Sequence, residues 1–315
     1  GSVQIYELGD WPAPFGIVLV LDRLAAMMLL LTALLALVVN LYVVGSGWDK
    51  RGANFHALFQ FQVMGIQGAF LTGDAFNLFV FFEVLLIASY GLMIHAGGTR
   101  RFQAGVQYVV YNLLGSTLFL FALGTLYSVT GTLNMADLAR LLPEVMDSKT
   151  VHAGFAFIVV GLALKAAIFP LHQWLPNAYA FAPSIVSVLL AATSTKVAIY
   201  ILIRFIFTIF GQAFSFSALP LQPLLMTLGI VGILAASTMA IYQNNVKHIL
   251  AYSSVAQIAY IMLALSFNNV SGITATLLHI FNHALMKGAL FLSLAAVMYR
   301  TGGVQLRHFA GLGQH

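Results

Sequence analysis

The chain has 315 residues, of which 61% are hydrophobic and only 7% carry a formal charge. Soluble domains have about 25% charged residues, and they need polar groups to cover a surface that faces water. This composition therefore excludes a soluble enzyme, a nucleic-acid-binding domain and a disordered chain. The absence of cysteine from the sequence excludes disulfides, thiolate nucleophiles and iron–sulfur clusters. We expect an all-α membrane protein that crosses the bilayer several times.

Residues 1–23 precede the first long apolar stretch. Pro12, Pro14 and Gly16 are followed by the apolar run 17–21, a pattern that predicts a turn or short hairpin outside the membrane. Asp22 comes directly after this run and is suited to cap a helix that begins there. We therefore predict an extracytoplasmic N-terminal segment at 1–23.

A helix of roughly 20 apolar residues crosses a hydrocarbon core of about 30 Å. Nine stretches of the sequence qualify: 24–44, 53–72, 75–94, 104–130, 151–169, 184–210, 222–243, 248–267 and 272–299. We therefore predict a transmembrane helical bundle at 24–299, with about nine helices, and a cytoplasmic tail at 300–315.

Basic residues gather in alternate connections between these stretches. One set of connections holds Lys50, Arg51, Arg100, Arg101, Lys247, Arg300 and Arg307. Most of the acidic residues lie in the opposite connections. The positive-inside rule places the basic set in the cytoplasm, so we expect residue 1 outside and residue 315 inside. This path, together with the missing initial methionine, predicts that further helices precede residue 1 in the whole protein.

Four charged residues lie deep within apolar stretches: Glu83, Lys165, Lys196 and Lys287. A charge at the centre of a membrane helix costs about 2.5–3.5 kcal/mol, so these side chains must pair, meet water or face the protein interior. One glutamate can neutralise only one of three lysines, which favours a role in ion transfer. The alternative is a static ion pair, with the other lysines extended to the membrane interface.

Lys165 is followed by Pro170 and Pro176. Because Pro170 has no N–H, the carbonyl of Ala166 loses its helical partner close to the lysine. The pattern predicts a broken transmembrane helix, which is tolerated only where the backbone faces protein or a hydrated cavity. With the lysine beside it, an ion site is favoured over an ordinary proline kink.

The last apolar stretch carries His279, His283 and Lys287 at i, i+4 and i+8. This spacing aligns them on one face of a helix, and such a row can pass protons because imidazole titrates near neutral pH. A merely hydrogen-bonded histidine pair is the alternative. A metal site is disfavoured, since no acidic residue or cysteine lies nearby. Lys247 and Arg204 are interpreted as charges at helix ends.

Three segments of the sequence resemble a known family. They are LTGDAFNLFVFFEVLL at 71–86, KAAIFPLHQWLP at 165–176 and VKHILAYSSV at 246–255. In this order they resemble the proton-conducting antiporter-like family, which includes the A and D subunits of the Mrp sodium/proton antiporters and the large pump subunits of respiratory complex I. The first segment is most similar to the D subunits of the Mrp antiporters. The resemblance covers essentially the whole chain.

This resemblance implies roles for the buried residues. It implies that Glu83 pairs with Lys165 at the broken helix and that Lys196 continues a hydrated path at the membrane midplane. His279, His283 and Lys287 would carry this path towards the far side. Family members have further helices, among them a second broken helix, so the resemblance implies only part of an inverted-repeat fold here.

We interpret the chain as a proton-translocating subunit of a multi-subunit Na+ or K+/proton antiporter in a bacterial-type plasma membrane. It would be a secondary transporter and not an enzyme. Its partners would be other membrane subunits, protons, a monovalent cation and the lipid bilayer, with no nucleic acid, no cofactor and no metal. The alternatives are a proton-pumping subunit of an NADH-quinone oxidoreductase or related hydrogenase, and a structural membrane scaffold whose charges are static.

Overall fold

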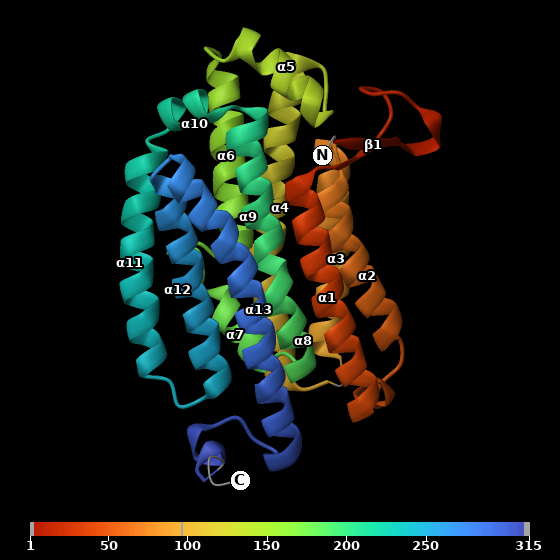
Figure 1. Ribbon diagram of the computed structural model, residues 1–315, viewed down its shortest axis with the longest axis vertical. Helices are drawn as coiled ribbons and strands as arrows, with labels where there is room; N and C mark the ends of the chain where they lie inside the picture. Colours follow the sequence, from red (N-terminus) through yellow and green to blue (C-terminus); the bar gives the residue numbers. More distant parts are fainter. Residues whose placement is uncertain (1–2, 96, 312–315) are drawn as a thin grey trace.

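Long apolar helices run side by side along the longest axis of the computed structural model, which describes residues 3–95 and 97–311 (Figure 1). Eight helical segments are long and apolar enough to cross a membrane. They are α1 (Arg23–Ser46), α3 (Ala75–Ile94), α4 (Thr99–Thr130), α6 (Lys149–Ala166), the segment Ser184–Ile209, α11 (Leu221–Ile241), α12 (Val246–Ser266) and α13 (Val270–Thr301). The remaining predicted span is α2 (Phe55–Leu71), whose 17 residues are near the shortest length for a crossing helix. The predicted bundle is confirmed.

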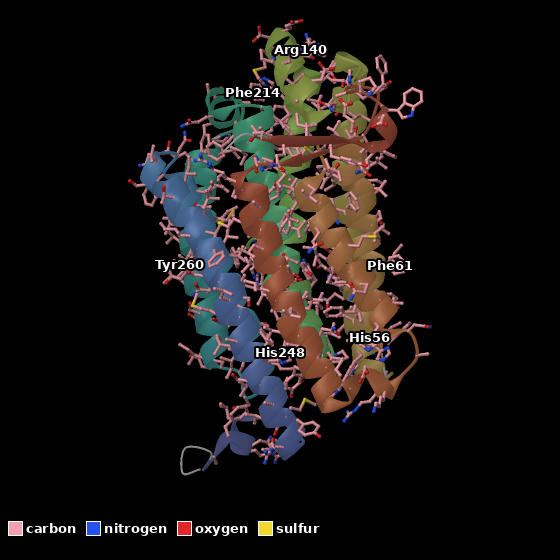
Figure 2. The ribbon with its side chains drawn as sticks, turned by 45° about the vertical axis from the view of Figure 1, so that its right-hand side comes forward. His56, Phe61, Arg140, Phe214, His248 and Tyr260 are labelled. Carbon is pink, nitrogen blue, oxygen red and sulfur yellow. The ribbon has the colours of Figure 1, made fainter. Side chains whose placement is uncertain are left out.

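Shorter elements lie at one end of the bundle. At one end lie α5 (Met135–Val145), α10 (Gln212–Ala218) and a hairpin of β1 (Gln4–Glu7) and β2 (Val18–Leu21), whereas the C-terminus lies at the other end (Figure 1). Figure 2 shows Arg140 and Phe214 at the hairpin end, and His56 and His248 towards the opposite end. The sequence did not predict α5 or α10, because helices of 11 and 7 residues are too short to appear as apolar spans.

The N-terminal hairpin is antiparallel, and Gln4 pairs with Leu21. The Asp22 side chain then accepts a hydrogen bond from the Ala25 N–H at 2.8 Å and caps α1, as predicted. Asp74 caps α3 in the same way, through the Asn77 N–H at 2.7 Å. Because β2 ends at Leu21 and α1 begins at Arg23, with only the cap Asp22 between them, the hairpin lies directly at the start of α1.

The predicted helix break lies between α6 and α7 (Trp174–Phe181). Ala167 adopts a left-handed conformation with φ 55°. The N–H of Ile168 donates to the Ala163 carbonyl at 3.0 Å, and the N–H of Ala167 donates to the Leu164 carbonyl at 3.1 Å. These two bonds form a Schellman motif, which satisfies carbonyls that a helix end otherwise leaves free. Lys165 therefore lies in the last turn of a helix that ends inside the bundle.

The most deeply buried segment, Ser184–Ile209, is not a regular α-helix. It consists of α8 (Ser184–Leu189), a π-helical stretch η3 (Leu190–Ser194), α9 (Thr195–Ile203) and a second π-helical stretch η4 (Arg204–Ile209). Every residue of α9 is buried, so this segment lies at the centre of the bundle. Short π-helical stretches within α-helices are frequent at functional sites.

Two glycines allow α4 and α6 to approach each other closely. A Cβ atom on Gly161 would lie 2.8 Å from the carbonyl oxygen of Gly115, and a Cβ atom on Gly115 would lie 2.8 Å from the carbonyl oxygen of Gly161. Real Cβ atoms essentially never come this close to another atom. The contact brings α4 against the last turns of α6, where Lys165 lies, because Gly115 is also close to the Lys165 side chain.

We expect Gly161→Ala to lower the thermal unfolding midpoint, because the added methyl group forces α4 and α6 apart at a cost of about 1–3 kcal/mol. Gly124→Ala on α4 is the matched control, since nothing lies within 4 Å of its added Cβ. Thermal denaturation in detergent, followed by size-exclusion chromatography, measures both. Equal midpoints for the two variants would contradict the close contact.

Candidate functional site

Lys165 occupies the end of α6 and is 6% exposed. Its Nζ atom lies 4.6 Å from the centroid of the Phe82 ring, a cation–π contact. The C-terminus of α6 also stabilises a cation through the helix dipole. Beside the ammonium is a small cavity, lined among others by Asn112 and Ser194, with room for about one water molecule. The end of α6 therefore offers Lys165 both groups that stabilise a positive charge and space for a water molecule.

Glu83 lies on α3, half-buried, next to Phe82. Its carboxylate lines a groove between α3 and α4 with Tyr90 and Leu113, and its Oε1 atom has no hydrogen-bond partner among the described residues. The contact ion pair with Lys165 implied by the resemblance is not present: the ion pairs found in residues 3–95 and 97–311 all involve other residues. The two charges interact over a longer distance.

Lys196 lies at the start of α9 and is 1% exposed. Its Nζ atom donates a short hydrogen bond to the Ala191 carbonyl in the π-helical stretch η3, and it lies 3.4 Å from Thr195 Oγ1. Ser194, two residues before it, lines the cavity of Lys165. On its other side, Lys196 is close enough to Lys287 for their charges to repel. Lys196 therefore connects the break in α6 with α13.

The titratable row on α13 is formed as the spacing predicts. The rings of His279 and His283 stack with centroids 6.1 Å apart and an interplanar angle of 7°. His283 is fully buried, and neither of its ring nitrogens has a hydrogen-bond partner among the described residues. Lys287 donates to the Leu250 carbonyl and to Ser253 Oγ on α12, both at 2.9 Å. The alternative of a directly hydrogen-bonded histidine pair does not fit this geometry.

Lys247 is a buried lysine whose environment the sequence did not reveal. It lies in the first turn of α12, at a helix end as interpreted, but the residue is only 3% exposed. Its Nζ atom donates to the Ala182 carbonyl at 2.5 Å and lies 3.2 Å from Ser187 Oγ. Ala182 follows the last residue of α7, so the ammonium stabilises the C-terminus of that helix. One signal was available: Lys247 lies just after the cap Asn245, where the dipole of its own helix disfavours a cation.

Arg204 lies at the end of α9, as interpreted, but the sequence did not reveal its partners. Its Nη2 atom forms an ion pair with Asp22 Oδ1 at 2.5 Å, and its Nε atom donates to Tyr200 Oη at 3.0 Å. The reason is that β2 and α1 meet the end of α9 at the hairpin, which places the capping carboxylate beside the guanidinium. The residues are far apart in the chain, so no local pattern indicated the pair.

The predicted site residues therefore come from several helices that meet around α9. Lys165, Lys196, His283 and Lys287 form one buried group, and the half-buried Glu83 and His279 lie at its margin. No group of three or more His, Asp or Glu residues in the described ranges is placed to hold a metal ion. Buried amines and imidazoles can each take up or release a proton, and the cavity beside Lys165 has room for about one water molecule. Proton transfer is the chemistry that this group supports.

Comparison with known proteins agrees with this interpretation of the fold. The family model described as NADH:quinone oxidoreductase/Mrp antiporter, TM, matches residues 72–314. The NADH-quinone oxidoreductase subunit N of Desulforudis audaxviator is 41% identical, over 100% of this chain and 63% of its own length. The D subunit of a probable K(+)/H(+) antiporter of Rhizobium meliloti is 42% identical, over 93% of this chain and 54% of its own length.

A solved structure, that of the Mrp complex from Dietzia sp. DQ12-45-1b, contains a chain that superposes with a TM-score of 0.88 and 33% identity. The match covers 97% of this chain and 56% of that one. The chain thus spans between one half and two thirds of the length of the proteins it matches. It belongs to the NADH:quinone oxidoreductase/Mrp antiporter transmembrane family, and it is an integral membrane protein.

We expect Lys247→Ala to lower the thermal unfolding midpoint, because it leaves the buried Ala182 carbonyl and Ser187 hydroxyl with one partner fewer, at a cost of about 1–3 kcal/mol. Lys50→Ala, which removes an exposed lysine at the same end of the bundle, is the control and should have little effect. Thermal denaturation in detergent compares the two variants. A Lys247→Ala midpoint that equals that of Lys50→Ala would mean that the buried contacts contribute nothing.

Proposed function

We propose that this chain is the proton-translocating part of a multi-subunit monovalent cation/proton antiporter, with Na+ or K+ as the cation. The observation that carries the proposal is the buried group of Lys165, Lys196, His283 and Lys287 around α9. Charges at membrane depth are costly and are kept where they serve transport. The relatives named as antiporter subunits support the same function for the whole protein.

The proposed path begins at Lys165. The carboxylate of Glu83 stabilises the protonated lysine across a distance that can change as α3 and α6 move. When the two separate, the ammonium loses that stabilisation, and its proton passes through water in the neighbouring cavity to Lys196. His283 and Lys287 accept it in turn. The repulsion between Lys196 and Lys287 disfavours two charges at once, so a proton that arrives at one favours release from the next.

The membrane potential supplies the energy in this proposal, about 2.3 kcal/mol per elementary charge per 100 mV. This is similar to the cost of one charge at the centre of a membrane helix, about 2.5–3.5 kcal/mol. The partners would be other membrane subunits of the same complex. The setting would be a bacterial-type plasma membrane, with the hairpin outside and residues 300–315 in the cytoplasm. Residues 24–299 would form the antiporter-like domain and residues 1–23 an external segment.

We expect Lys165→Ala to abolish cation/proton exchange in vesicles that contain the complete complex, because the first proton acceptor is lost. Glu83→Ala should reduce exchange strongly for the same reason. The control is Lys149→Ala, an exposed lysine at the other end of α6, which should leave exchange unchanged. Exchange is measured by the fluorescence of a pH-sensitive dye after addition of Na+ or K+. Normal exchange in Lys165→Ala would refute the proposal.

A second function is favoured by the similarity to the oxidoreductase subunit, which extends over 100% of this chain at 41% identity. In that case the same path would be driven by redox reactions in partner subunits of an NADH-quinone oxidoreductase. The two functions predict different complexes. Purification of the native complex should give no flavin or iron–sulfur absorbance if it is an antiporter, and visible absorbance from both groups if it is an oxidoreductase.

A further inference from the structure

A cavity opens beneath the β-hairpin, and its lining comes from β1, β2, the start of α5 and the end of α9. Figure 1 shows β1 and α5 at the same end of the bundle. Its walls are mainly apolar, but four titratable side chains reach into it. They are Glu7, Asp22, Tyr200 and Arg204. Thr72, Asn134 and Thr208 add neutral polar groups to the lining. A cavity with polar groups on several walls can hold water, and this one is open towards the hairpin end.

A second row of polar side chains leads from the centre of the bundle to this cavity. Lys196, Tyr200 and Arg204 lie at i, i+4 and i+8 along α9 and the start of η4, and this spacing places them on one helix face. The Tyr200 hydroxyl accepts from Arg204 Nε at 3.0 Å and donates to the Phe70 carbonyl at 2.9 Å. The row covers about 12 Å along the helix axis, from eight residues at about 1.5 Å each.

The row ends in the ion pair of Arg204 with Asp22. Asp22 Oδ1 accepts from both Arg204 Nη2 at 2.5 Å and the Ala25 N–H at 2.8 Å. Burial alone would raise the pKa of Asp22, but the hydrogen bonds from Arg204 and the backbone outweigh burial and lower it. The carboxylate is therefore ionised at neutral pH and holds the guanidinium at the base of the cavity.

The backbone around this row is suited to a change of register. α9 is a segment of nine residues with a π-helical stretch at each end. Lys196 is the second residue after one stretch, and Arg204 is the first residue of the other. A hydrogen bond in a π-helical stretch spans one residue more than a hydrogen bond in an α-helix, so each stretch holds one extra residue. A shift of this extra residue along the helix would turn α9 and move Lys196 and Arg204 together.

We infer that the cavity beneath the hairpin is the opening of the proton path on that side, and that the Asp22–Arg204 ion pair is its gate. This inference rests on the proposed transport function. Tyr200 lines the connection between the gate and Lys196. When the pair separates, water extends from the cavity to Lys196. While the gate is open, the Lys196 ammonium gives its proton to that water instead of passing it to His283 and Lys287. The proton then passes to a carboxylate of Asp22 or Glu7 and from there to bulk water, and Lys196 is left as the neutral amine.

His279 and His283 follow α13 from Lys287 towards the hairpin end, and the half-buried His279 contacts the ring of Tyr260. The row on α9 instead ends at a cavity that is open to the outside of the bundle. The row on α9 therefore reaches a cavity that has polar groups in its lining.

The first test measures access of water to the cavity in the complete complex. The chain has no cysteine, so single cysteines can be labelled with a membrane-impermeant thiol reagent and detected on this chain by mass spectrometry. Ile201→Cys, at the base of the cavity, should react with reagent added on the hairpin side. Ile199→Cys is the matched control: it is equally buried on α9 but does not line the cavity, and it should not react. An unreactive Ile201→Cys would overturn the inference.

The second test opens the gate. Asp22→Asn removes the charge but keeps the helix cap, since asparagine caps as well as aspartate. Combined with Val197→Cys, a buried position one turn from Ile201 towards Lys196 that does not line the cavity, it should raise the labelling rate about fivefold, the change expected from the loss of about 1 kcal/mol of pairing. It should also increase proton leak across vesicles in the absence of Na+ and K+. Asp74→Asn, at the cap of α3, has no ion-pair partner in the described structure and is the control.

Arg204→Gln removes the other member of the ion pair and should have the same effects on labelling and proton leak. It replaces Asp22→Asn in the experiment if the Asp22→Asn complex does not assemble. Unchanged labelling and unchanged leak in both variants would refute the gate. The labelling and leak measurements test the gate, whereas the exchange measurement with Lys165→Ala tests the transport function. Loss of exchange in Lys165→Ala with no effect of Asp22→Asn would leave the antiporter proposal intact and remove the gate. Increased labelling in Asp22→Asn with normal exchange in Lys165→Ala would remove the transport function and leave a hydrated cavity that an ion pair closes.

Discussion

The structure depends on one constraint, the cost of placing an ammonium group in a bundle surrounded by hydrocarbon. Lys165, Lys196, Lys247 and Lys287 are all buried, and none of them forms an ion pair within the described residues. Each instead makes its direct contacts with neutral groups. Three donate to backbone carbonyls, and Lys165 lies over an aromatic ring at a helix end. Neutral partners stabilise an ammonium less than a carboxylate does, so the stability of each of these charges depends on a few contacts.

Irregular backbone provides several of these partners. A regular helix uses its own carbonyls, whereas a break, a helix end or a π-helical stretch leaves some of them available. Lys165 lies at the end of α6, Lys247 contacts the end of α7, and Lys196 contacts η3. Membrane proteins tolerate such irregularities only where protein or water surrounds them. The breaks and the buried charges therefore belong to the same part of the bundle and require each other.

Close packing positions these features. Gly115 and Gly161 bring α4 against α6, and the Trp174 indole N–H donates to the Leu164 carbonyl at 3.0 Å, which fixes the start of α7 beside the last turn of α6. The same turn holds Lys165. A shift of either helix would therefore change the space around the lysine, and this couples the position of the helices to the stability of the charge.

Much of this arrangement follows from the sequence. Its composition, its apolar stretches and Pro170 predict the spans and the break, because hydrocarbon solvent and a missing N–H act on each segment locally. The spacing of His279, His283 and Lys287 likewise predicts one helix face. The surroundings of Lys247 could not be predicted in this way, since its partners Ala182 and Ser187 are about 60 residues away in the chain.

The sequence by itself determined which segments cross the membrane and which charges are too deep to be solvated, because both depend on local hydropathy. Only the tertiary structure decided which groups those charges meet. Glu83 is separated from direct contact with Lys165, whereas Arg204 meets Asp22 from 182 residues away. Such partners are set by how helices pack and where their backbones become irregular. Packing of this kind depends on the shapes of all the side chains together, and no single segment contains that information.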